Sequence, residues 1–65
     1  MEKTRESAID LMVRVFENTN RQMAAMSGMS EEDIDKSISE AHAGMVYYMS
    51  TVFDKLEDND FIKLN

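Results

Sequence analysis

The stretch AAMSGMSEEDI, residues 24–34, decides how the rest of this 65-residue chain folds. Gly28 has no Cβ, so it can adopt the left-handed backbone conformation that ends a helix at little steric cost. Ser30 follows two residues later and is well placed as the N-cap of a second helix, with Asp33 at the position of a capping-box partner. The stretch therefore reads as the end of one helix and the start of another.

Two further local signals support a corner at this point. Met29 precedes the cap and Ile34 is the fourth residue after it, which is the spacing of a hydrophobic staple. Glu31, Glu32 and Asp33 place negative charge where the helix dipole is positive. A connection this short predicts that the two helices run antiparallel.

The composition favours helix over strand along the whole chain, with no proline and only two glycines. We therefore expect an all-α protein with a single helical-hairpin domain. Its expected parts are a first helix over about 4–27, a turn over 28–30, a second helix over about 31–57 and a short apolar tail over 58–65.

Apolar residues recur with heptad spacing on both sides of the corner. In the first helix this row contains Ile9, Met12, Phe16, Met23 and Met26, with Thr19 in its one gap, while Leu11 and Val13 lie off the row. In the second helix the row contains Ile34, Ile38, Ala41, Met45, Tyr48 and Val52. A second row widens its apolar face with His42, Met49, Phe53 and Leu56.

A chain this short has a marginal core, so it needs a further source of stability. Cysteine is absent and there is one histidine, which leaves association with a second copy as the expected source. We predict that two hairpins form a dimeric four-helix bundle. The residues predicted for the dimer core are Ile9, Met12, Phe16, Met23, Ile38, Ala41, Met45 and Val52.

Glycine in a helix interior costs up to about 1 kcal/mol, so Gly44 calls for an explanation. If positions equidistant from the turn face each other, Phe16 lies opposite Ala41 and Gly44, and a large ring meets small residues. We expect a close approach of the two helices at Gly44. A kink in the second helix that serves a binding site is the alternative.

The middle of the second helix has a wider apolar surface than contact with the first helix requires. Aromatic and methionine side chains are enriched at interfaces, so this surface is the candidate site for a protein partner. The tail gives a further aromatic residue, which either folds back over the bundle or docks on a partner. The predicted partner-binding residues are Tyr47, Tyr48, Met49, Phe53 and Phe61.

Catalytic chemistry is not expected from these residues. His42 lies at the edge of an apolar face, and the serines of the second helix have no base at matched spacing. A pH-sensitive interface is the alternative for this histidine. The acidic clusters lack the ligand spacing of a calcium loop. We therefore predict no catalytic residue, no metal site and no cofactor.

The net charge of −6 lies entirely in the second half of the chain, because residues 29–65 carry three basic and nine acidic side chains. Nucleic-acid binding draws on clustered lysine and arginine, so it is not expected here. A helical hairpin of 65 residues resembles, in architecture, the plasmid copy-control protein Rop, whose two hairpins form a four-helix bundle that binds RNA. This chain lacks the positive helix face that RNA binding would need, so that function is not carried over.

No apolar run approaches the length that crosses a bilayer, and the N-terminal residues do not resemble a signal peptide. We expect no membrane partner and a cytoplasmic location. The leading hypothesis is a small non-catalytic module that binds a larger protein and modulates or inhibits it, a type of product that phages and plasmids encode. The alternatives are an acidic decoy that occupies a nucleic-acid-binding site, or a structural subunit of a larger assembly.

Overall fold

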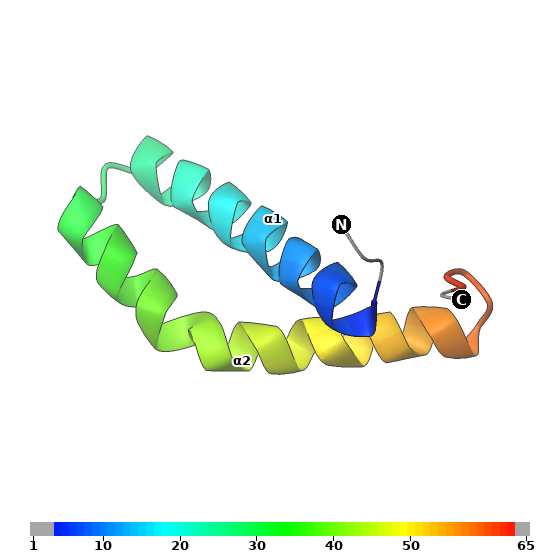
Figure 1. Cartoon of the computed structure of the whole chain (residues 1–65). Helices are drawn as coiled ribbons and strands as arrows, with labels where there is room; N and C mark the ends of the chain where they lie inside the picture. The colour runs from blue at the N-terminus through cyan, green and yellow to red at the C-terminus, as the bar shows by residue number, and fades with distance from the viewer. Residues whose placement is uncertain (1–3, 64–65) are drawn as a thin grey trace.

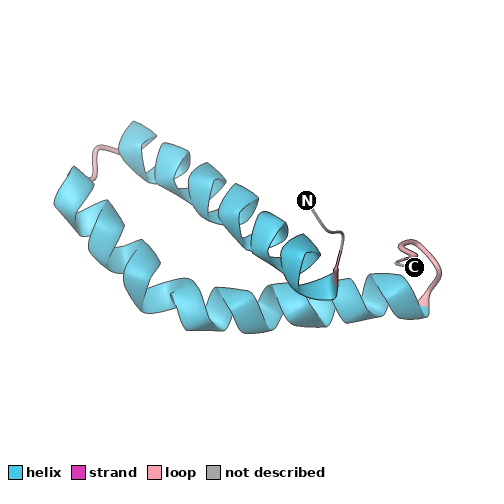
Figure 2. Ribbon diagram, viewed as in Figure 1, coloured by secondary structure: helices cyan, strands magenta, loops and turns pink. Residues whose placement is uncertain are grey.

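The chain folds as an all-α helical hairpin, which confirms the predicted fold class (Figure 1). The computed structural model describes residues 4–63 and contains helix α1, Arg5–Met26, and helix α2, Glu31–Asp58. The helices run antiparallel, and α2 extends past the start of α1 (Figure 2). The molecule is elongated, measuring 42 × 24 × 19 Å.

Helix α1 ends at the corner through backbone hydrogen bonds, as the sequence predicts. Gly28 is left-handed, with φ +90°. Its N–H donates to Ala25 O at 3.1 Å, and the N–H of Met29 donates to Ala24 O at 3.2 Å. These two bonds form a Schellman motif, which satisfies carbonyls that the end of the helix would otherwise leave free.

The start of α2 is capped by Ser30, which also confirms the prediction. The Ser30 hydroxyl accepts a hydrogen bond from the backbone N–H of Asp33 at 3.2 Å. A complete capping box appears instead at the start of α1. There Thr4 Oγ1 accepts from the Ser7 N–H at 3.1 Å, and Ser7 Oγ accepts from the Thr4 N–H at 2.9 Å.

The cap at Ser30 gives a first testable prediction. Ser30→Ala removes the only side-chain acceptor for the Asp33 N–H, so we expect a loss of about 0.5–2 kcal/mol in the free energy of unfolding. Urea denaturation followed by circular dichroism measures this loss. Ser39→Ala, at an exposed position inside α2, is the matched control and should stay close to the parent.

If Ser30→Ala and Ser39→Ala unfold at the same urea concentration as the parent, the cap does not contribute as described.

Gly28→Ala, measured by the same urea denaturation, should lose about 1–2 kcal/mol of unfolding free energy, because a Cβ is strained at positive φ. Nothing lies within 4 Å of the position of that Cβ, so the loss would come from backbone strain and not from a clash.

The hairpin core is concentrated where the start of α1 crosses the second half of α2. It contains Ile9, Val13, Met49 and Phe53, and Phe53 is fully buried. Near the turn, Ile34 is also buried. The core is therefore small, and it joins the two helices mainly at the end away from the turn.

The placement of Val13 off the buried row was wrong, since only 2% of its surface is exposed. It lies four residues after Ile9, on the same helix face, and both side chains pack against α2. The heptad row that begins at Ile9 turns gradually away from α2. As a result Met23 and Met26 are exposed, although they continue the row.

The expected close approach at Gly44 was also wrong. A Cβ at this position would meet nothing within 4 Å, so neither Phe16 nor any other group packs against it. Figure 1 shows that α2 bends in its middle part. This bend agrees with the kink of the alternative, whose service to a binding site stays a prediction. The bend also explains why the helices separate between the core and the turn.

The tail folds back at the end of α2. Asp60 has φ 62°, its N–H donates to Glu57 O at 3.1 Å, and the N–H of Phe61 donates to Leu56 O at 2.8 Å. This is a second Schellman motif, with an aspartate at the left-handed position. Ile62 then packs against the hairpin core, while Phe61 is 78% exposed. Residues 64–65 of the predicted tail lie outside the described residues.

Candidate interaction surfaces

The two sides of the hairpin differ in chemistry. One side, called the apolar side below, presents apolar residues of both helices that the hairpin core leaves wholly or partly exposed. Helical spacing assigns to it Leu11, Met12, Val15, Phe16 and Met23 of α1 and Ala41, Met45, Tyr48 and Val52 of α2.

A shallow hollow of about 430 Å³ lies on the apolar side. It is lined by Leu11, Met12, Val15, Phe16, Thr19 and Met49. Thr19 is the only polar residue among them, and its hydroxyl is occupied by donating to Val15 O at 2.9 Å. The hollow therefore offers apolar contact and little capacity for directed hydrogen bonds.

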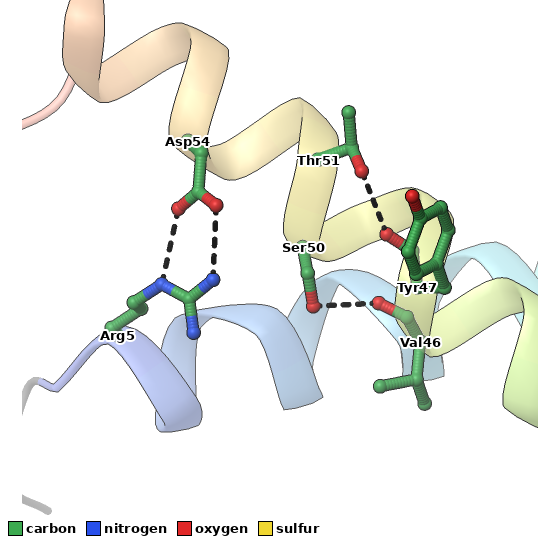
Figure 3. A network of polar contacts seen from close by, with 6 residues as sticks. All are labelled: Arg5, Val46, Tyr47, Ser50, Thr51 and Asp54. Carbon is green, nitrogen blue, oxygen red and sulfur yellow. Dashed lines mark hydrogen bonds and ion pairs between the residues drawn. The ribbon is translucent and has the colours of Figure 1, made fainter.

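The opposite side of the hairpin carries hydrogen-bonded ion pairs between the helices. Arg5 donates two hydrogen bonds of 3.1 Å to the carboxylate of Asp54, as Figure 3 shows. His42 Nδ1 lies 2.9 Å from Glu17 Oε2, and Arg21 pairs with Asp35 nearer the turn.

Arg5 and His42 line one hollow of about 260 Å³ on this side. Ser50 also lines it, but its hydroxyl donates to Val46 O at 2.7 Å (Figure 3). Ser50 therefore bonds within its own helix, and it follows His42 by eight residues, which is more than two turns of α2.

The Arg5–Asp54 pair predicts how stability changes with pH. Hydrogen bonds from Arg5 lower the pKa of Asp54 below its ordinary value of 3.8, against the smaller opposing effect of desolvation. The folded-state pKa is depressed, so the stabilisation is present above pH 3.8 and is lost as the pH falls through the lower folded pKa.

We therefore expect Asp54→Asn to lose stability at neutral pH and to show a smaller loss than the parent on acidification below pH 3.8. Thermal melts from pH 7 to pH 2 measure the difference. Asp58→Asn removes a carboxylate from the same end of α2 and serves as the control. Equal pH dependence in the Asp54→Asn variant and the parent would contradict this role for the pair.

Of the five residues predicted to bind a partner, three are exposed in the structure and two are buried. Tyr47 is 76% exposed, and Tyr48 and Phe61 are also largely exposed. Met49 and Phe53 are buried in the hairpin core, so the prediction that they face a partner is corrected. The row containing Met49 and Phe53 faces α1, and the neighbouring row containing Tyr48 and Val52 lies on the apolar side.

Tyr47 and Tyr48 point in different directions because successive residues of a helix are separated by about 100°. Tyr48 lies three residues after Met45 and four before Val52, so it belongs to the apolar side. Tyr47 lies on the outer face of α2, away from Met45 and Met49. Partner binding by either tyrosine stays a prediction.

The residues predicted for the dimer core occupy three environments in the single chain. Ile9 is buried in the hairpin itself; Met12, Ile38, Met45 and Val52 are partly buried; Phe16, Met23 and Ala41 are exposed. Apart from Ile9, these residues have surface that a second molecule could cover. Sequence spacing could have found the missed core residue Val13 through its four-residue separation from Ile9.

The hairpin exposes more surface than a compact protein of its mass. Its accessible surface is 5247 Å² for 7.5 kDa, whereas a folded monomer of that mass exposes about 4,200 Å². Its radius of gyration is 13.9 Å, compared with about 11 Å for a compact 65-residue domain. The excess of about 1,000 Å² is similar to the roughly 800 Å² that each partner buries in a standard interface.

Metal-binding clusters and membrane-spanning helices are not found within residues 4–63. No group of three histidine, aspartate or glutamate side chains lies close enough together there to hold a metal ion. Neither α1 nor α2 has the length and apolar character of a membrane-spanning helix.

Comparisons of the sequence with models of protein families and with curated proteins, and of the fold with solved structures, find no match. Function is therefore inferred from the surfaces of the hairpin itself.

Proposed function

We propose that this protein is a non-catalytic protein–protein interaction module that works as a dimeric four-helix bundle. The apolar side joins two copies, and the outer face of α2 binds a larger protein and inhibits it. The observation that carries this proposal is the exposed apolar side, which spans both helices and contains little hydrogen-bonding capacity.

The exposed area supports a second copy as the occupant of the apolar side. A small protein that exposes about 1,000 Å² more than a compact monomer has enough uncovered surface for one standard interface. The hairpin core is also too small to be the only source of stability, since its four central residues join the helices at one end. Packing two apolar sides together extends that core along the molecule.

Tyr47 supports the second part of the proposal. It stays on the outer face of α2 when the apolar side is covered, because it points away from Met45 and Met49. A largely exposed tyrosine with no packing role in the hairpin is a candidate hot spot, and truncation of such a residue commonly costs 2 kcal/mol or more of binding energy. Phe61, three residues after the end of α2, is a further exposed aromatic residue.

A quantitative capture experiment from cells of the source organism tests this function. Tagged parent, Tyr47→Ala and the double variant Glu31→Lys/Glu32→Lys are immobilised in equal amounts, and retained proteins are measured by mass spectrometry. If the proposal holds, at least one partner protein is captured by the parent and at least about tenfold less by Tyr47→Ala. Its capture by the charge-reversed variant changes little. Circular dichroism and sedimentation must show unchanged helicity and mass for both variants.

The acidic-decoy alternative rests on the eight carboxylates of α2 and predicts the reverse ranking. Capture by a decoy would fall steeply with added salt, because it depends on charge, while contact through Tyr47 would be nearly insensitive to salt. Repeating the capture at two salt concentrations therefore separates the two functions. Capture that depends on neither surface would contradict both.

A further inference from the structure

The two helices differ strongly in charge, and this difference restricts how two hairpins can pair. In α1 there are three basic and three acidic side chains, and in α2 there are two basic and eight acidic ones. The charge of −6 therefore lies on α2, while α1 is neutral.

Two arrangements place antiparallel helices next to each other throughout a dimeric bundle of hairpins. With the two turns at opposite ends, α1 lies beside the partner's α1 and α2 lies beside the partner's α2. With the two turns at the same end, each α1 lies beside the partner's α2, and the two α2 helices occupy diagonal corners. The apolar side can be covered in either arrangement.

Electrostatic repulsion favours the second arrangement. Adjacent helices are about 8–10 Å apart, which is close to the Debye length of about 8 Å in physiological salt. Two α2 helices side by side would place sixteen carboxylates along one seam with only four basic side chains. At diagonal corners the same helices are about 1.4 times farther apart, and a neutral α1 lies between them.

Exposed methionines at the turn favour the same arrangement. Met26 is 87% exposed, and Met23 and Met29 are also exposed. With both turns at one end, these flexible side chains lie near those of the partner, and each copy can cover the other. With the turns at opposite ends, they would lie near the acidic end of the partner's α2, which contains Glu57 and Asp58.

We infer that a second copy of this chain covers the apolar side with its turn at the same end, so that each α1 packs between two α2 helices. This inference rests on the proposed function, because it specifies the partner of the apolar side. It predicts a bundle in which the two turn regions meet at one end and the two folded-back tails meet at the other.

Cysteine cross-linking tests the arrangement in a chain that contains no native cysteine. Met23 lies near the turn and Val52 lies near the other end of the apolar side, in a hairpin that is 42 Å long. A short bismaleimide is added to full-length Met23→Cys alone, and separately to an equilibrated mixture of Met23→Cys and Val52→Cys chains. Mass spectrometry identifies which chains become linked.

In the same-end arrangement, two Met23→Cys chains should become linked to each other. No product should link a Met23→Cys chain to a Val52→Cys chain. The opposite-end arrangement expects the reverse, because it brings Met23 level with the partner's Val52. Sedimentation of each variant before the reagent is added shows whether it is dimeric.

A mixed product without the homodimer product, or neither product from a chain that sediments as a dimer, overturns the same-end arrangement and leaves the dimer intact. A parent chain that sediments as a monomer overturns both this arrangement and the proposed assembly. The Tyr47 capture result is independent of both outcomes, so failure of the partner-binding proposal remains distinguishable.

Discussion

Phe53→Ala is expected to lose about 3–5 kcal/mol of folding free energy, the cost typical of removing a buried phenylalanine. Phe53 is fully buried and packs with Ile9, Val13 and Met49 in the small core that joins the two helices. Few other residues can relax into the space that the ring would leave. For a chain of 65 residues this loss is a large part of the total stability.

Urea denaturation at one fixed protein concentration measures this effect, since dimer formation makes stability depend on concentration. Phe61→Ala is the matched control, because it makes the same chemical change at an exposed position. It should stay within about 0.5 kcal/mol of the parent. If Phe53→Ala is no less stable than Phe61→Ala, the core has been placed wrongly.

The second large effect concerns assembly, and it is expected for Met23→Glu. Met23 lies exposed on the apolar side near the turn, so the proposed dimer would bury a carboxylate there in each copy. An unpaired buried polar group costs about 1–3 kcal/mol, and a charged group costs more. Two such groups in one dimer raise the dissociation constant by roughly 100-fold or more.

Sedimentation across a range of protein concentrations measures the dissociation constant. Ala25→Glu adds the same charge two residues later, at an exposed position that points about 200° around the helix from Met23. It should stay dimeric at concentrations where Met23→Glu is monomeric. Equal dissociation constants for the two variants would mean that the apolar side is not the dimer interface.

The exposure of Tyr47 in the candidate partner site could be predicted from sequence. The burial of Met49 and Phe53 could not. Tyr47 lies off both apolar rows of α2, so its exposure follows from helical periodicity alone. Met49 and Phe53 lie on one of two adjacent apolar rows, and spacing does not say which row faces α1. The packing of α1 against α2 selects the row, and it selected the one predicted to remain free.

Sequence alone determined the corner and the two helices, because the interactions that define them join residues close together in the chain. Gly28 and Ser30 act through hydrogen bonds that reach no farther than five residues, and no distant contact is needed to form them. The tertiary structure decided which apolar residues are buried. Val13 packs with Phe53, which follows it by 40 positions, and that contact depends on the crossing of the helices, the rotation of each about its own axis and the bend in α2. These features are set by the fit of side chains from both helices at once, so the periodicity of either helix alone does not contain them.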